Sequence, residues 1–479
     1  MKRINNKIYQ YAGIACILIL LGACKSINLS NRAENKTVPK SYATATDTIN
    51  LAKTKWKDYF KDTELIELID SALYRNQELN IILQEIKIAN NEIRARKGAY
   101  LPYVFGGAEA GVDKVGRHTS QGASDAITEI APGKATPEIF SNYSLGVNMA
   151  WEADIWKKLR NAKKSAVFKY LSTVEGKNFM VTNLISEIAN SYYELIALDN
   201  QLDILRKNIE LYQISLDIVK LEKQSARVTE LAVRRFEAEV LKTQSRQYYI
   251  MQQIVETENR INFLVGRFPQ PVIRNSKGFT EIKLDTFYAG IPSQLLENRT
   301  DIRQAEQALQ AAKLDVKAAK AEFYPSLVIA AGVGYGAFNP QYLFQSPQSL
   351  LYNIAGGLVA PLINRNAIKA NYLSANAKQI QAVYNYERAI LNAHIEVVNQ
   401  LSNINNLNQS YVLKDSQVQT LTQAIDISTT LFRSARADYM EVLLTQRDAL
   451  ESKIELVENK KLQLNARVNI YRALGGGWN

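Results

Sequence analysis

One stretch of 109 residues, 366–474, contains neither glycine nor proline, the two residues that most often interrupt helices. Within it an apolar or aromatic residue recurs at every seventh position: Val383, Ile390, Val397, Ile404, Tyr411, Val418, Ile425 and Phe432. A strict seven-residue repeat is typical of helices that wind left-handedly around partners, because a helix of 3.6 residues per turn must be under-wound to hold such a seam. The stretch therefore predicts a long coiled helix.

The same column occurs a second time, 209 positions earlier: Val174, Val181, Ile188, Leu195, Leu202, Ile209 and Leu216, with a break at Lys223. Positions outside the column agree at the same shift. Residues 225–227 and 434–436 both read Ser-Ala-Arg, and Gly266 corresponds to Gly475. Because internal repeats fix an architecture before local assignments do, we expect one elongated body made of two similar halves. Each half turns around at its Ser-Ala-Arg sequence.

The beginning of the chain is typical of a signal peptide. Residues 1–23 hold three basic side chains, no acidic one and a short apolar run at 11–21. They end in Leu-Gly-Ala before Cys24, which resembles the lipobox of bacterial lipoproteins, where the thiol receives diacylglycerol. The alternative is an ordinary signal with an incidental cysteine. Cys16 would be removed with the signal, so no intramolecular disulfide is possible in the mature chain.

Residues 24–55 are polar and have no hydrophobic period, so we interpret them as an acylated, extended tether. We expect ordered structure to begin at Trp56. The rest of the chain divides into a first repeat at 56–270 with a helical hairpin at 157–265, a linker at 271–300, and a second repeat at 301–479 with a hairpin at 366–474. Each long helix of about 69 residues would extend ~100 Å and needs neighbours along its length.

Four segments alternate large apolar residues with small or polar ones, at about 102–112, 141–152, 325–336 and 350–361. Segments of about ten residues with this pattern are typical of transmembrane β-strands; a soluble sandwich with one buried face is the alternative for each segment alone. Four strands cannot sit in lipid as an open sheet, because the edges stay unpaired. Since the smallest barrels need about eight strands, we expect oligomerisation, and three copies would supply twelve.

Composition argues against several other functions. The net charge of +11 is spread along the predicted helices without a basic cluster interleaved with aromatics, so nucleic acid is not an expected partner. The two histidines, His118 and His394, have no partner at ligand spacing, and no phosphate loop or nucleophile elbow is present. We expect neither catalysis nor a metal, and no cofactor apart from the covalent lipid on Cys24.

The sequence resembles the TolC-type outer-membrane efflux factors, in their lipidated, OprM/CusC-like (NodT) branch. The most specific stretch is 291–306, IPSQLLENRTDIRQAE, which the family writes LPSxLLExRPDIRxAE. Thr300 replaces the usual proline, and Lys157 and Asn366 stand where a glycine is common. The other carriers are Cys24, the residues Trp56, Asp62 and Leu65, the run 151–156 (WEADIW), the run 323–325 (FYP), the run 361–365 (PLINR) and the terminal run 473–478 (ALGGGW).

This resemblance implies an α+β membrane protein: a homotrimer with a twelve-stranded β-barrel, four strands per chain, in the outer membrane and a coiled-coil helical barrel through the periplasm. The implied partners are two further copies, outer-membrane lipid, a periplasmic adaptor and an inner-membrane pump, usually of the resistance-nodulation-division (RND) class. The protein would be a passive exit duct for drugs, metals or other small molecules, and the cargo is not specified. The alternative is a lipid-anchored periplasmic scaffold or adaptor without a pore.

The two turns are the candidate gate and adaptor-binding tip. In the family, a leucine followed by an Asp and an Arg three apart forms the constriction. Here Met440 stands at the leucine position and Arg447 at the arginine position, but Leu444 replaces the aspartate, so that latch cannot form unless Glu441 or Asp448 substitutes. The alternative is that these charges are merely solvated. The candidate residues are Arg227, Glu230, Arg436, Asp438, Met440 and Arg447.

Overall fold

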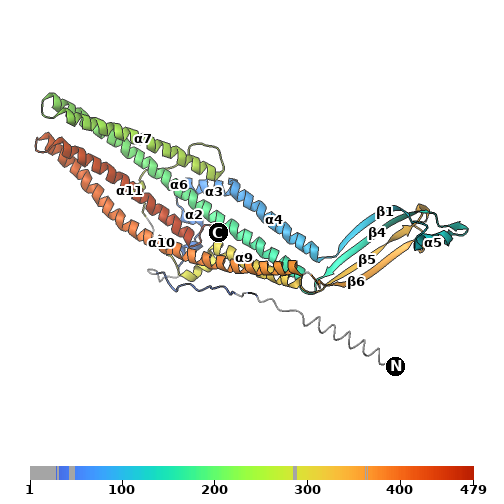
Figure 1. Ribbon diagram of the computed structural model, residues 1–479. Coiled ribbons are helices and arrows are strands. Elements are labelled where there is room, and N and C mark those ends of the chain that lie inside the picture. The colour runs from blue at the N-terminus through green and yellow to red at the C-terminus, as the bar shows by residue number, and fades with distance from the viewer. Residues whose placement is uncertain are drawn as a thin grey trace.

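The computed structural model describes residue 29 and residues 32–42, 49–283, 288–361, 363 and 365–478. The chain is elongated, with a β-sheet at one end and two helical turns at the other (Figure 1). The predicted signal peptide and Cys24 lie outside the described residues. Among the residues that are described, no helix is both long enough and apolar enough to cross a membrane.

Each half of the chain repeats one order of elements. The first half contains α2 (Trp56–Tyr59), α3 (Thr63–Arg75) and α4 (Gln77–Tyr100), then strands β1 and β4, then α6 (Lys158–Gln224) and α7 (Glu230–Val265). The second half contains α8 (Leu295–Asn298) and α9 (Thr300–Ala321), then β5 and β6, then α10 (Asn366–Arg433) and α11 (Tyr439–Ala473). The predicted duplication, with its long helices, is confirmed. We call α6–α7 hairpin 1 and α10–α11 hairpin 2.

The four long strands form one antiparallel sheet in the order β1 (Tyr103–Lys114), β4 (Ile139–Ala153), β5 (Ser326–Ala337) and β6 (Leu350–Val359). The register places Gly107 beside Gly146 and Gly146 beside Gly334, so one face carries small or polar residues. The opposite face carries Val147, Val333 and Tyr352, which are exposed in the single chain. One edge of each outer strand, β1 and β6, has no partner within the described chain.

The connection between β1 and β4 contains regular structure of its own. It contains α5 (Ser120–Ile127) and a small hairpin of β2 (Glu129–Ala131) and β3 (Lys134–Ala135). The second repeat has only the short 3-10 helix η4 (Pro340–Tyr342) at the corresponding place. The longer connection of the first half therefore forms a small folded unit at the end of the sheet furthest from the helices (Figure 1).

Order also begins earlier than Trp56, where we had expected it. Residues 32–42 lie extended along α9 and α10, because their charges are paired: Arg32 with Glu387 at 2.7 Å, and Lys36 with Glu306 at 2.7 Å. Tyr42 is buried and stacks on His394. The 3-10 helix η1 (Leu51–Lys53) follows. Residues 32–42 are extended, and specific contacts bind them to the body.

Burial along the two seams differs. In α6 the seam residues Ile188, Leu195 and Leu216 are buried, in clusters shared with α3, α7 and α11. In α10 the seam is buried from Val383 to Ile404, but Tyr411, Val418, Ile425 and Phe432 are only half-buried. The half of α10 nearer its turn is therefore incompletely covered by its own chain.

Candidate functional site

The two tip turns have the same backbone geometry. Ala226 and Ala435 adopt left-handed conformations, with φ of 57° and 56°. After α6, the amide of Arg227 donates to the carbonyl of Glu222 and that of Ala226 donates to the carbonyl of Lys223; the same pair of bonds follows α10, at Arg436 and Ala435. This is the Schellman arrangement, which satisfies the last carbonyls of a helix and normally uses glycine at the left-handed position. The shared Ser-Ala-Arg sequence thus encodes one turn twice.

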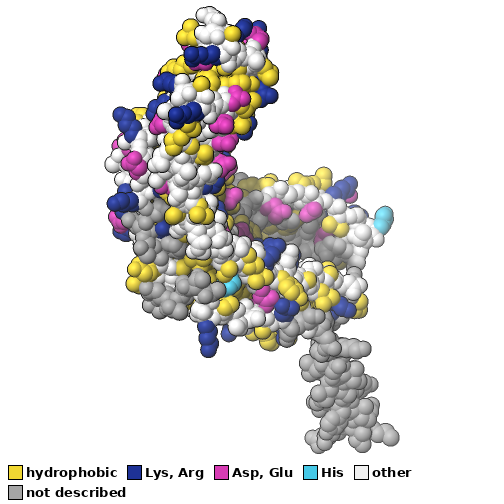
Figure 2. Space-filling model, turned by 90° about the vertical axis from the view of Figure 1, so that its left-hand side faces the viewer, with side chains coloured by type: hydrophobic (Ala, Val, Ile, Leu, Met, Phe, Trp, Pro, Cys, Tyr) yellow, Lys and Arg dark blue, Asp and Glu magenta, His cyan; other side chains and the backbone are white. Residues whose placement is uncertain are grey.

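Charges at the first turn pair locally. Glu230 pairs with Lys223 and, at 2.8 Å, with Arg234. The hydrogen bond from Lys223 lowers the pKa of Glu230 below its ordinary value. Arg227 lies 3.7 Å from Glu222. All of these groups except the half-buried Glu222 are exposed, so each pair contributes little to stability. The predicted residues Arg227 and Glu230 lie together on one turn. Seen from the end of the molecule that carries the helical turns, the surface has basic, acidic and apolar side chains interspersed (Figure 2).

The second turn has free charges. Arg436 and Asp438 are exposed, and within the described residues neither side chain has an ion pair or hydrogen bond. Asp438 is the N-cap residue of α11 but its carboxylate caps no amide. Such groups remain available to an external partner.

Met440 and Arg447 have different neighbours. The Sδ of Met440 accepts a hydrogen bond from Arg235 Nη1 at 3.3 Å, which joins hairpin 2 to hairpin 1. Arg447 pairs with the adjacent Asp448 at 3.2 Å, and Leu444 is exposed. Glu441 and Asp448 were the two residues that could substitute for the missing aspartate. Arg447 contacts Asp448, which lies in the same helix.

The sequence did not indicate the other contacts that join the hairpins near the tip. Arg246 of α7 pairs with Glu451 of α11 at 2.7 Å. In the interior, Ser215 of α6 and Gln446 of α11 exchange hydrogen bonds. In neither pair are the two residues related by the internal repeat. Each contact depends on how the two hairpins pack. No periodicity in the sequence identifies them.

At the opposite end of the hairpins, the run 151–156 forms the junction between sheet and helix. The buried Asp154 carboxylate accepts from the amides of Leu159 and Arg160, which caps the start of α6. The indole of Trp156 donates to the Pro325 carbonyl at 2.8 Å and stacks on Tyr324. This motif holds the strands of both repeats to the helices, and its role is structural.

The run 291–306 is also structural. Its Arg299, whose side chain is 7% exposed, binds Asp301 and Glu396 at 2.7 Å each and donates to the Ala473 carbonyl at 2.9 Å. The terminal residues pack against the same place, with the Trp478 indole donating to the Asn298 carbonyl. Two motifs far apart in sequence therefore meet where α9, α10 and the end of α11 join.

In the described parts of the chain, no group of three or more His, Cys, Asp or Glu side chains could hold a metal ion. What the arrangement offers is a long helical body with a tip of free and paired charges and a sheet with two open edges. These features are typical of a conduit subunit rather than of a catalytic pocket.

Comparison with known proteins defines the class. The family model described as "Outer membrane efflux protein" matches residues 68–267 and 291–476, one match for each repeat. The chain belongs to this family. It is therefore an outer-membrane channel of an efflux system, which is a transport protein and not an enzyme.

Relatives with different cargoes are equally similar to the chain. The pyoverdine export outer membrane protein OpmQ of Pseudomonas aeruginosa is 26% identical, covering 88% of this chain and 87% of OpmQ. The cation efflux system protein CusC of Escherichia coli is 26% identical over 97% and 98%. The crystal structure of the open state of the Neisseria gonorrhoeae MtrE outer membrane channel has a TM-score of 0.82 at 21% identity, covering 95% and 99%, and this likeness shows the fold.

Proposed function

We propose that three copies of this chain form a passive exit duct, with a twelve-stranded barrel in the outer membrane and a helical tunnel in the periplasm. The half-buried seam of α10 carries this proposal, because Tyr411, Val418, Ile425 and Phe432 lack full cover within their own chain. A second observation agrees with it. The sheet has two open edges, and an open four-stranded sheet is not viable in lipid.

The exposed apolar residues support the same assembly. On α7 they include Leu241, Tyr248 and Tyr249, and on α10 Val412, Leu413 and Ile427. Large apolar side chains exposed along one helix would be covered if that helix packed against a neighbour. A neighbouring copy that packs α7 against α10 would cover both sets and close the ring.

The lipid and the partners are part of the proposal. Cys24 would carry the lipid that fixes the N-terminal tether to the inner face of the outer membrane. The free charges of Arg436 and Asp438, with Arg227 and Glu230, would meet a periplasmic adaptor that connects the duct to an RND-type inner-membrane pump. CusC, a cation efflux protein, and OpmQ, a pyoverdine export protein, are both 26% identical to this chain. We therefore propose that the pump selects the cargo.

Conductance tests this function directly. The membrane-extracted protein, reconstituted in a planar lipid bilayer, is expected to give discrete conductance steps. Protein unfolded by heat before reconstitution is the control and should give none. A folded, membrane-inserted protein that never conducts would overturn the proposal of a pore and favour a lipid-anchored scaffold.

A further inference from the structure

A short connecting segment, residues 272–282, joins the two hairpins of one chain halfway along their length. It follows α7 and has no regular structure except the 3-10 helix η2 (Phe279–Glu281). We call this segment the belt. Its first part contacts α6 and α7, and its last part contacts α10 and α11.

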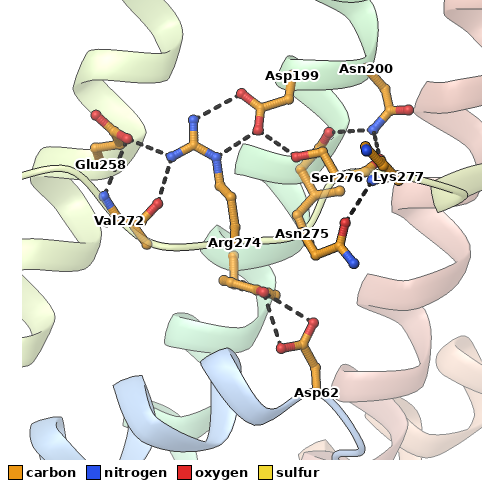
Figure 3. Close-up of polar contacts among 11 residues, drawn as sticks. Asp62, Asp199, Asn200, Glu258, Val272, Arg274, Asn275, Ser276 and Lys277 are labelled. Atoms are coloured by element: carbon orange, nitrogen blue, oxygen red, sulfur yellow. Dashed lines mark hydrogen bonds and ion pairs between the residues drawn. The ribbon is translucent and has the colours of Figure 1, made fainter.

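The belt is fixed to hairpin 1 by Arg274 (Figure 3). The guanidinium makes two bonds to the Asp199 carboxylate of α6, at 2.6 and 2.8 Å, and one to Glu258 of α7 at 2.5 Å. Ser276 Oγ donates to the same Asp199, and Asn200 donates to the Ser276 carbonyl. The Arg274 side chain is 14% exposed, so solvent screens these bonds weakly.

The other end of the belt is fixed to hairpin 2 by two donors. Lys460 of α11 is 4% exposed and donates to the Ile282 carbonyl at 2.7 Å. Tyr411 of α10 donates its hydroxyl to the Thr280 carbonyl at 2.7 Å, and the Lys460 ammonium lies over its ring. Between the two ends, Phe279 is buried in a core cluster that contains residues of α6, α7 and α11.

The two ends of the belt lie at matching heights of the repeat. The equivalent of Asp199 in the second half is Asn408, only three residues, or about 4.5 Å along a helix, from Tyr411. From this height to the turns, each hairpin continues for a further ~35–39 Å. The contacts between hairpins 1 and 2 over that length include Arg246–Glu451, Ser215–Gln446 and Arg235–Met440.

We propose that the belt sets the separation of the two hairpins and thereby restrains the tip, with Arg274 and Lys460 as the positioning residues at its two ends. The part of each hairpin between the belt and its turn is a long helical pair that we treat as rigid. A small change in separation at the belt therefore becomes a larger change at the turns, and release of either end allows the tip to widen. This inference rests on the proposed function as a duct.

The test compares bilayer conductance of the full-length trimer carrying Arg274→Gln or Lys460→Met with the unaltered protein. Each variant frees one end of the belt, and we expect conductance to rise at least about twofold because the population of the wider tip increases. Tyr411→Phe and Ser276→Ala each remove a single hydroxyl and give the same direction of change if the larger variants do not assemble.

Matched controls are available within each hairpin. Arg260→Gln removes an α6–α7 ion pair with Glu187, and Lys414→Gln removes an α10–α11 pair with Glu455; neither touches the belt. Both should conduct like the unaltered protein. Amide exchange supplies a second readout, and belt variants should exchange faster at the two turns.

The outcomes separate the two proposals. If the unaltered protein conducts and the belt variants conduct equally, with slow exchange at the turns, the belt only stabilises the fold and the inference is wrong. If no protein conducts, the duct itself is disproved and the inference with it. A lower melting temperature without a change in conductance also counts against the belt as a restraint.

Discussion

Arg299 is the residue on which the second half of the chain converges. It has two carboxylate partners and one carbonyl partner, and these partners raise its pKa further above the ordinary value despite the cost of burial. Arg299 belongs to a motif that is visible in the sequence, but its role depends on the meeting of α9, α10 and the end of α11 in the fold.

Substitution of Arg299 is expected to be severe. Arg299→Met leaves Asp301 without its cation, whereas Glu396 keeps its pair with Arg472 at 2.8 Å. Breaking a buried pair costs about 3–5 kcal/mol. A large drop in thermal unfolding temperature would show this. Lys57→Gln removes an exposed pair with Asp70 and is the control, expected to change stability by less than about 1 kcal/mol. If the two variants lowered the unfolding temperature equally, Arg299 would not be the buried ion-pair centre of the second half.

Asp62 gives a pH-dependent prediction. Its carboxylate caps α3 at Leu65 and accepts from the Tyr192 hydroxyl, while burial raises its pKa. When the pKa of a carboxyl is higher in the folded than in the unfolded state, its protonation stabilises the fold. This contribution to the free energy of unfolding is complete below the unfolded-state pKa near 3.8, and it is lost as the pH rises through the folded-state pKa. Asp62→Asn keeps an acceptor for the cap without the charge.

We therefore expect Asp62→Asn to melt at a higher temperature than the unaltered protein at neutral pH. The difference should shrink as the pH falls through the raised pKa towards 3.8, because both proteins then have a neutral side chain. Melting curves between neutral and acidic pH measure this. A difference that grows on acidification would show that the sign is wrong.

At the scale of single elements, the start of α6 combines a stabilising side-chain cap with one residue in an unfavourable backbone conformation. Asp154 satisfies two amides, whereas Lys157 adopts a left-handed conformation with φ of 61°. Asp154→Ala should destabilise the helix start by about 1–2 kcal/mol. Lys157→Gly should stabilise it by up to about 1 kcal/mol, because a Cβ is disfavoured there.

Amide exchange of the first turns of α6 measures both changes, which should have opposite signs. The amides of Leu159 and Arg160 report Asp154→Ala most directly, because both donate to its carboxylate. Faster exchange in Lys157→Gly would contradict the expected relief of strain.

The long helices and the four strands could be predicted because each depends on a period in the sequence. The heptad column gave α6 and α10, the shift of 209 gave their duplication, and the alternation of residues gave the sheet. The contacts of Arg246 with Glu451 and of Lys460 with the belt could not be predicted. They depend on the packing of elements about 200 residues apart, and their spacing matches no repeat.

One expectation failed for a local reason. We expected ordered structure to begin at Trp56, because residues 24–55 are polar and lack a hydrophobic period, yet Arg32 and Lys36 bind partners on α9 and α10. Polar composition shows that a segment has little core, but it does not exclude order through ion pairs.

At the scale of the whole molecule, assembly should depend on apolar residues that the single chain leaves exposed. Leu413 of α10 is 72% exposed. Leu413→Asp would place a charge in the contact between copies, where burial without a partner costs several kcal/mol, and the fraction of trimer should fall. Size-exclusion chromatography with mass detection measures that fraction.

Leu413→Met keeps the apolar surface and is the matched control. It should assemble normally. An aspartate variant that remains fully trimeric would show that this part of α10 does not face a neighbouring copy.

The most direct measurement of the central claim is the native mass of the protein extracted from membranes in detergent, together with the mass of its single chain. We predict three chains per particle and a single-chain mass that includes a lipid on Cys24. A monodisperse, folded single chain would contradict the duct, because the four strands that one chain provides cannot close a barrel.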